Sequence, residues 1–307
     1  MSGARSIFLG VDGGGSKTAF VLVGGDGDVL ATHEAGSAYY PETGLEAVRV
    51  MLHAGVTALL RQAGVAAGDV TSAFFGLPMH GEDDQTPLLD RLPEGLLPAG
   101  RHTCGNDMLC GWAGSLGGED GINIVAGTGS IGYGEIGARR ARCGGWGELF
   151  SDEGSAYWIA REGLALFSRM SDGRAEKGPW YAILRGQLGS RADLELATWV
   201  VRELGGDRSR IAALARLVHE AAVGGDAQAA AIFAAAGSEL AQIAIAIRRQ
   251  LGVPDGLDVR VSYSGGVFAS GDAVTAPFRG ALAASGMRFT LVRPRFAPVI
   301  GAALYAA

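Results

Sequence analysis

A glycine-rich turn near the start of the chain, GVDGGGSKT at residues 10–18, constrains the fold more than any other feature. The flanking segments 6–11 and 18–23 both have the apolar pattern of β-strands, so the glycines connect two strands. A Walker A loop needs Gly directly before Lys-Ser/Thr and runs into a helix, whereas here Ser16 precedes Lys17 and a strand follows. The turn therefore predicts a hairpin whose backbone N–H groups meet a phosphate, and not a P-loop.

The same strand–turn–strand pattern recurs in the second half of the chain. VAGTGS at 125–130 aligns with VDGGGS at 11–16, and an apolar strand pattern follows each turn. Only the first copy carries an acid, Asp12, where the second has Ala126. Because Mg²⁺ is held by few protein ligands besides phosphates and water, one carboxylate suits one nucleotide with one ion. The repeat predicts two related domains that offer phosphate hairpins to a shared cleft.

The remaining elements predict α/β domains with mixed sheets, because three strands and then alternating helices and strands occur twice. Gly117-Gly118 is the expected boundary, which gives domains 1–117 and 118–296 and a closing helix, 297–307, that can return to the first domain. Within the second domain we expect one helix that opens at Ser151-Asp-Glu-Gly-Ser and another over Arg210 to Ala222.

Composition narrows the functional class. The chain has a formal net charge of −6 and a pI near 5.4, which argues against a nucleic-acid or anionic-membrane surface. Its three cysteines form no CxxC pair, which favours a reduced, cytoplasmic protein, and the first residues lack the apolar run of a signal peptide. The apolar segment 227–247 contains Gln, Ser and Glu, so it predicts a buried helix rather than a membrane span.

Two further motifs make the sequence recognisable: CGGWGELFSDEGSAYW at 143–158 and SGGV at 264–267. With the two hairpins, they resemble the sugar-kinase branch of the actin/hexokinase/heat-shock-chaperone superfamily over essentially the whole chain. The closer resemblance is to the BadF/BadG/BcrA/BcrD-type ATPase family and, within it, to the N-acetylglucosamine kinases. The resemblance implies two ribonuclease H-like (actin-like ATPase) domains, α/β with mixed sheets flanked by helices, and an active site in the interdomain cleft.

By that resemblance, individual residues take roles in binding ATP, Mg²⁺ and an amino sugar. Asp12 would hold Mg²⁺, and Asp107 would contact the sugar hydroxyl as the general base that accepts its proton. The phosphates would be bound by Gly13, Gly14, Gly15, Ser16, Lys17, Thr18, Gly127, Thr128, Gly129 and Ser130. The adenosine would lie against Gly265 and Gly266, and the sugar against Tyr39, Trp146, Gly147 and Asp152.

Several of these residues have an alternative role. Asp107 and Asp152 both precede expected helices, so either can be a helix cap, and Trp146 can belong to the core. Tyr39 stands near the position where the kinases often have a sugar-binding Asn.

The expected reaction converts N-acetylglucosamine to its 6-phosphate, in a homodimer that binds no nucleic acid or membrane. Glucosamine kinase is the closest alternative. An alternative of another class is an ATPase activator of a dehydratase, whose iron–sulfur cluster needs cysteine spacings that Cys104, Cys110 and Cys143 do not have.

Overall fold

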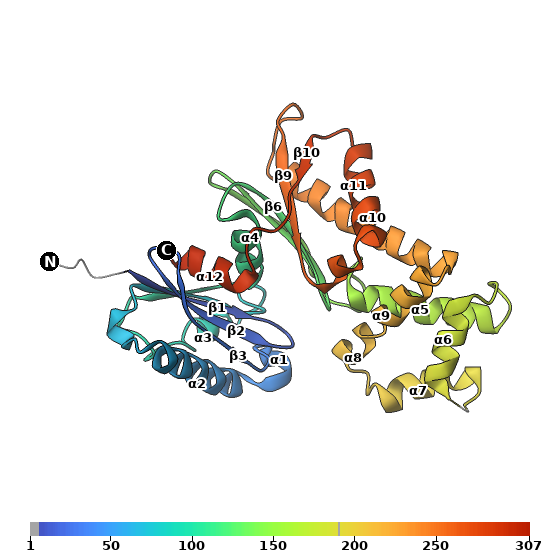
Figure 1. The fold of residues 1–307 in the computed structure, drawn as a ribbon, viewed down its shortest axis with the longest axis horizontal. Coiled ribbons are helices and arrows are strands. Elements are labelled where there is room, and N and C mark those ends of the chain that lie inside the picture. Colours follow the sequence, from blue (N-terminus) through green and yellow to red (C-terminus); the bar gives the residue numbers. More distant parts are fainter. Residues whose placement is uncertain (1–5, 190) are drawn as a thin grey trace. The chain divides into compact units, whose positions relative to one another are not determined.

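The chain divides into two compact units, unit 1 formed by residues 1–120 and 293–307 and unit 2 by residues 121–292 (Figure 1). The structure is a computed structural model that describes residues 6–189 and 191–307. Each unit contains one five-stranded mixed sheet with helices packed on it.

The sheet of unit 1 has the strand order β3-β2-β1-β4-β5. Its strands are β1 (Ile7–Gly13), β2 (Thr18–Gly24), β3 (Val29–Ala35), β4 (Ser72–Gly76) and β5 (His102–Gly105). The first three strands form an antiparallel meander, and β4 and β5 continue the sheet in parallel with β1. The register pairs Gly13 with Thr18, so residues 14–17 form the turn of the first hairpin.

Helices cover both faces of this sheet. They are α1 (Tyr40–Thr43), α2 (Leu45–Ala63), α3 (Thr86–Leu89), α4 (Met108–Leu116) and α12 (Pro298–Ala306). Leu9 and Val11 of β1 share one buried cluster with residues of α2, whereas a Cβ at Gly10 would collide with the backbone of α12. Because side chains alternate along a strand, Asp12 projects on the same face as Gly10, the face that α4 and α12 cover.

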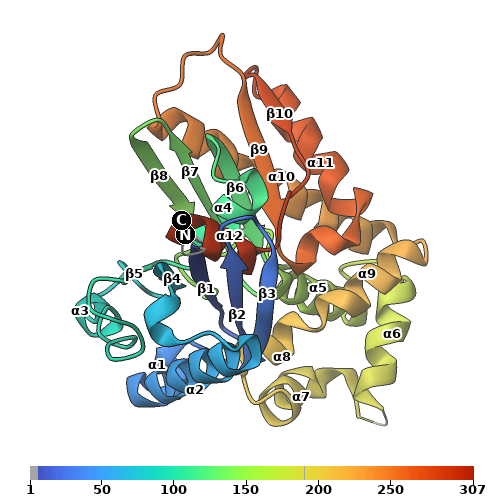
Figure 2. The ribbon, with the colours of Figure 1, turned by 60° about the vertical axis from the view of Figure 1, so that its left-hand side comes forward.

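The sheet of unit 2 repeats this arrangement, with the order β10-β9-β6-β7-β8. Its strands are β6 (Gly121–Ala126), β7 (Ser130–Ile136), β8 (Arg139–Gly144), β9 (Val259–Ser264) and β10 (Phe289–Leu291). Again the first three are antiparallel and the last two run parallel to the first, and Figure 2 shows the five strands in this order. The predicted α/β architecture with two mixed sheets flanked by helices is confirmed.

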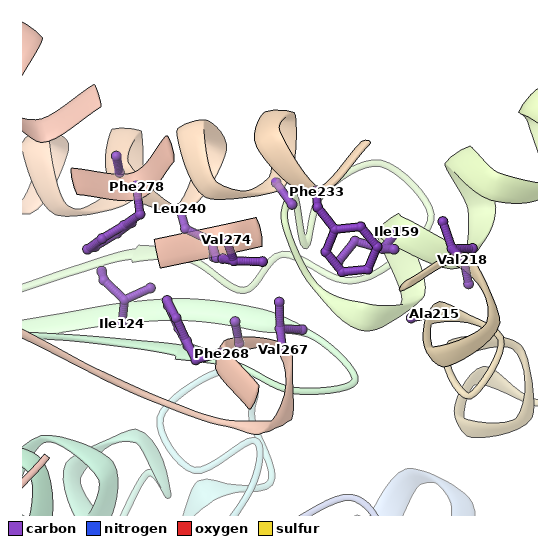
Figure 3. Packing of buried hydrophobic residues seen from close by; sticks show 14 of the residues in the cluster. Ile124, Ile159, Ala215, Val218, Phe233, Leu240, Val267, Phe268, Val274 and Phe278 are labelled. Carbon is purple, nitrogen blue, oxygen red and sulfur yellow. The ribbon is translucent and has the colours of Figure 1, made fainter. Parts of the chain in front are cut away.

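A block of helices lies between β8 and β9 in the chain. The helices of unit 2 are α5 (Ala156–Ser171), α6 (Pro179–Leu188), α7 (Leu196–Glu203), α8 (Arg208–Ala212), α9 (Ala215–Val223), α10 (Ala227–Gln250) and α11 (Asp272–Ala284). Figure 3 shows Leu240 of α10 beside Val274 and Phe278 of α11, and Phe233 of α10 beside Ile159 of α5. Among the described residues, α10 alone is long and apolar enough to cross a membrane. In the folded protein, 50% of its most apolar stretch is buried.

Two helix boundaries in unit 2 differ from the expectation. The helix expected from Ser151 begins at Ala156, because Ser155 is its N-cap and accepts a hydrogen bond from the Trp158 amide. The single helix expected over Arg210 to Ala222 is two helices, α8 and α9, both of which pack on α5. The periodic apolar pattern continues through the break, so it did not reveal it.

Candidate active site

The turn of the first hairpin, residues 14–17, exposes backbone N–H groups. The Gly14 amide donates to the Lys17 carbonyl at 2.9 Å and closes the turn. Residues 15–17 are exposed, and among the described residues the Gly15 and Ser16 amides donate no backbone or side-chain hydrogen bond. Thr18 differs from these, since it is fully buried and its hydroxyl donates to the Gly36 carbonyl at 2.8 Å. The turn can therefore offer amides to an anion, while Thr18 anchors its base.

Asp12 lies where β1 ends, next to the first turn of α4, which carries Asp107 and Cys110. Burial and the nearby Asp107 carboxylate raise the pKa of Asp12 to about 7, and a hydrogen bond from the Cys110 thiol partly opposes them. The approach of α4 depends on Gly76 of β4, where a Cβ would lie under 3.0 Å from Cys110 Sγ. The fold thus brings two carboxyl groups together, although they are 95 positions apart in the chain.

Asp107 does not cap α4 with its side chain. It stands at the N-cap position, but the helix has no side-chain cap bond from it; Asn106 Oδ1 accepts the Met108 amide at 3.1 Å instead. Asn106 is itself held, because its Nδ2 donates to Glu82 Oε1 and to the His80 carbonyl. The capping alternative for Asp107 is therefore wrong.

Asp12 fits the role of a magnesium ligand. A carboxyl group whose pKa is raised by burial and by a second carboxylate gains stability from a nearby cation. Among residues 6–189 and 191–307, no group of three or more His, Cys, Asp or Glu side chains is placed to hold a metal. Mg²⁺ is usually held by one or two protein carboxylates together with phosphates and water, so Asp12 can serve as a ligand without a larger cluster of side chains.

Two other predicted residues are Lys17, the last residue of the first turn, and Tyr39, which lies beside that turn. Lys17 Nζ lies 2.7 Å from Glu34 Oε1 on β3, and this contact raises the pKa of Lys17. Tyr39 ends the loop after β3, where its amide donates to Ser37 Oγ at 3.0 Å. The same loop is tied to the hairpin, since the Ala38 amide donates to the Gly14 carbonyl at 3.0 Å. Lys17 is thus already paired, and Tyr39 is placed next to the turn.

The turn of the second hairpin, residues 127–129, is docked on the start of α5. The Ala156 and Tyr157 amides donate to the Gly127 and Thr128 carbonyls at 2.9 and 3.2 Å. The Thr128 and Gly129 amides donate no hydrogen bond among the described residues. Because α5 fixes the carbonyls, these two amides remain available to an anion.

Three more predicted phosphate- and adenosine-binding positions serve the structure of unit 2. Ser130 is buried, and its hydroxyl donates to the Glu153 carbonyl at 2.8 Å. Gly265 has φ +98° and lies against the Ala126 backbone, where a Cβ would be under 3.0 Å away, and Gly266 begins a short 3₁₀ helix (Gly266–Ser270).

The predicted sugar loop presents apolar side chains to solvent. Trp146, Leu149 and Phe150 are 76%, 81% and 75% exposed, so the alternative of Trp146 as a core residue is wrong. Gly147 belongs to the same loop, and its carbonyl accepts the Ser151 amide at 3.0 Å.

Asp152 differs from that loop because it is buried. It is 2% exposed and has φ +57°, a conformation rare for residues other than glycine. Its carboxylate accepts hydrogen bonds from the Ser130 and Gly147 amides and pairs with Arg208. It does not cap α5, because Ser155 does.

The motifs missed three side chains that hold these residues. They are Cys110, which contacts Asp12, Glu34, which pairs with Lys17, and Arg208, which pairs with Asp152. Their partners lie 98, 17 and 56 positions away, so no local pattern marks them. Glu34 had the strongest signal, because strand pairing across a short hairpin brings it near Lys17.

The chain is similar to known proteins over most of its length. Residues 9–306 match the BadF/BadG/BcrA/BcrD ATPase family. The chain is 27% identical to N-acetyl-D-glucosamine kinase of Dictyostelium discoideum over 274 residues, 86% of each chain. It is 29% identical to N-acetylmuramic acid/N-acetylglucosamine kinase of Clostridium acetobutylicum over 237 residues, 76% of each.

Two crystal structures share the fold. One is of a Chromobacterium violaceum protein whose proposed activity is N-acetylglucosamine kinase, with 26% identity and a TM-score of 0.78 over 99% of this chain and 100% of that one. The other is a ROK family glucokinase of Streptomyces griseus in complex with glucose and AMPPNP, with 20% identity and a TM-score of 0.61 over 98% of both chains. The chain belongs to the BadF/BadG/BcrA/BcrD ATPase family, and it is an ATP-dependent kinase.

Proposed function

We propose that this kinase transfers the γ-phosphoryl group of ATP to an amino sugar, converting N-acetylglucosamine to N-acetylglucosamine 6-phosphate. The observation that carries the proposal is the pair of carboxyl groups of Asp12 and Asp107 at the end of β1, next to a turn with exposed amides. Phosphoryl transfer needs a positioned base, charge compensation and held phosphates. Two relatives with amino-sugar kinase activities, at 27% and 29% identity, support the substrate class.

The two acids have different tasks in this proposal. Asp107 accepts the proton of the attacking sugar hydroxyl, a role that typically accelerates a reaction by about 10²–10⁴. Asp12 holds Mg²⁺, which when bound neutralises charge on the phosphates. The raised pKa of Asp12 supports this division, because a cation relieves the repulsion between the two carboxylates.

Each hairpin binds phosphates of Mg-ATP. In the first, the Gly15 and Ser16 amides and Lys17 contact them, with Gly13, Gly14 and Thr18 shaping the turn. In the second, the Thr128 and Gly129 amides do so, with Gly127 and Ser130 fixing the turn. The available amides and the buried Thr18 and Ser130 support these assignments.

Other residues bind the adenosine and the sugar. Gly265 and Gly266 accept the adenosine against their backbone. Tyr39, Trp146, Gly147 and Asp152 hold the sugar, and the exposed face of Trp146 supports this role.

The direct test is ADP release coupled to a readout enzyme, with N-acetylglucosamine, glucosamine, glucose, N-acetylmannosamine and N-acetylmuramic acid as acceptors. We expect the highest kcat/KM with N-acetylglucosamine. We also expect NMR to show that the product is phosphorylated at O6. A higher kcat/KM with glucosamine would overturn the acetylated substrate but keep the kinase. No sugar-dependent ADP release with any acceptor would overturn the proposed function.

The assembly and compartment are part of the same proposal. We propose a homodimer, which light scattering after size exclusion tests. We also propose a cytoplasmic location, which the three free cysteines support because the cytosol keeps thiols reduced. Fractionation of cells that produce the protein tests the location.

A further inference from the structure

Arg208 is the first residue of α8, in the helical block of unit 2 and outside every recognised motif. Its Nη2 lies 2.5 Å from Asp152 Oδ2, and its Nε lies 3.3 Å from Glu148 Oε2. The Arg208 side chain is 27% exposed and that of Asp152 only 3%. A buried carboxylate is costly without a partner, so Arg208 is what makes the charge of Asp152 tolerable.

Asp152 links Arg208 to the second hairpin, because its carboxylate contacts both. Its carboxylate accepts the backbone N–H of Ser130, the residue that ends the turn, and that of Gly147 in the sugar loop. Its φ of +57° is strained for a residue other than glycine and persists only when surrounding contacts enforce it. The ion pair with Arg208 is such a contact, because it fixes the carboxylate at its far end.

Arg208 also packs directly against the turn. A Cβ at Gly129 would lie under 3.0 Å from Arg208 Nη2 and from Asp152 Oδ2. The turn is therefore enclosed on two sides: the α5 amides hold the Gly127 and Thr128 carbonyls, and the Arg208–Asp152 pair touches Gly129. The hydrogen bonds from α5 and the contact of the Arg208–Asp152 pair with Gly129 together orient the remaining amides of the turn, those of Thr128 and Gly129.

We propose that Arg208 is a positioning residue for the second hairpin, which it holds through Asp152 in the geometry that binds the ATP phosphates. Through Glu148 it also ties the sugar loop to the same hairpin. The proposal rests on the proposed function only in assigning phosphates to this turn. The restraint of residues 127–130 by Arg208 can be measured without any reaction.

The test compares Arg208→Gln with Arg210→Gln, a control on the same helix whose side chain is exposed. Hydrogen–deuterium exchange is followed in peptides that cover residues 126–131, and KM and kcat are measured with ATP varied. We expect Arg208→Gln to speed exchange in these peptides about tenfold or more and to lower kcat/KM for ATP about tenfold to a hundredfold, while Arg210→Gln changes neither. Exchange in peptides of β1 and β2 serves as the internal reference.

Two further variants keep the result decisive if Arg208→Gln folds poorly. Arg208→Lys retains the charge but loses the two-sided contact, and we expect an intermediate effect on both readouts. Adding methylguanidinium to Arg208→Ala is expected to slow exchange at 126–131 and to restore part of the ATP dependence, which a purely global folding defect does not allow.

The outcomes separate the two proposals. Equal exchange and equal kcat/KM in Arg208→Gln and Arg210→Gln would overturn the role of Arg208. Faster exchange at 126–131, with ADP binding by calorimetry equal to that of the parent, would overturn it as well, because the turn would then not position phosphates. Faster exchange and weaker ADP binding, in a protein that phosphorylates no sugar, would support Arg208 and overturn the amino-sugar assignment alone.

Discussion

The carboxyl groups of Asp12 and Asp107 lie close enough for their charges to repel, and together with burial this raises the pKa of Asp12 to about 7. Asp12 comes from the end of β1 and Asp107 from the start of α4, on the sheet face that α4 and α12 cover. An apoprotein that keeps two acids together is strained in the way expected of a site that binds a cation.

Replacing Asp107 with Asn is expected to abolish sugar phosphorylation while leaving ATP binding nearly intact. The amide cannot accept the proton of the sugar hydroxyl, so kcat falls about 10²–10⁴-fold. Coupled ADP release gives kcat, and calorimetry with ADP gives binding. Asp255→Asn, at an exposed position in unit 2, is the matched control. Full activity in Asp107→Asn would remove Asp107 from the base role.

Replacing Asp12 with Asn is expected to have opposite effects on stability and on activity. Loss of one of two neighbouring carboxylates removes their repulsion from the folded apoprotein, so its unfolding temperature rises by about 2 °C or more. The same change weakens the Mg²⁺ dependence of nucleotide binding and lowers turnover. Differential scanning fluorimetry and Mg²⁺ titrations at fixed ATP measure the two effects. An unchanged Mg²⁺ dependence would contradict the metal role.

Gly129→Ala and Gly127→Ala form a pair within one turn. A Cβ at 129 meets Arg208 and Asp152, whereas a Cβ at 127 meets no atom within 4 Å. We expect Gly129→Ala to destabilise the apoprotein by about 1–3 kcal/mol, the usual cost of overpacking, and Gly127→Ala to have little effect. Urea unfolding of both variants without nucleotide measures the difference. Equal stability of the two variants would show that the Arg208 and Asp152 side chains can move away from residue 129 without lowering the free energy of unfolding.

The cost of removing Arg208 is expected to depend on pH. Burial raises the pKa of Asp152, Glu148 raises it further, and Arg208 and the Ser130 and Gly147 amides lower it. Without Arg208 the folded-state pKa of Asp152 moves further above its unfolded value. A protein that contains an acid with a raised folded-state pKa loses stability as the pH rises above the pKa of that acid in the unfolded state. The reason is that the folded state must then bury a charge.

Arg208→Gln should therefore be more destabilised, relative to the parent protein, at pH 8 than at pH 5. Urea unfolding at both pH values measures this, with Arg210→Gln as the control. A loss of stability that is the same at both pH values would mean that Asp152 carries no buried charge in the variant.

The thiols are expected to react slowly in the folded protein. Burial raises the pKa of Cys104 to about 12, that of Cys110 well above its usual range, and that of Cys143 to a smaller extent. Because the thiolate is the reactive form, Ellman's reagent at pH 8 should modify Cys143 first and Cys110 last. All three should react at once in urea. Fast labelling of Cys110 in the native protein would mean that α4 does not pack on Asp12 as described.

The hairpins were predictable because their signals are local. A turn rich in glycine between two apolar strands allows one arrangement, and the second copy at 125–130 gave the same result independently. The start of α5 was not predictable from local signals, because it involves residues far apart in the chain. Asp152 and Glu153 have the composition of a helix start, but Asp152 has a left-handed φ, and its carboxylate pairs with Arg208, which lies 56 positions later.

The sequence by itself determined the repeated strand–turn–strand units, the mixed α/β sheets and the membership of the family, because each is marked by short motifs and by the apolar pattern of single elements. Only the tertiary structure decided that Asp107 leaves the capping of α4 to Asn106, that it faces Asp12, and that Arg208 holds Asp152. The physical reason is that charge and burial depend on the three-dimensional neighbours of a side chain, and packing, which joins residues far apart in the chain, selects those neighbours.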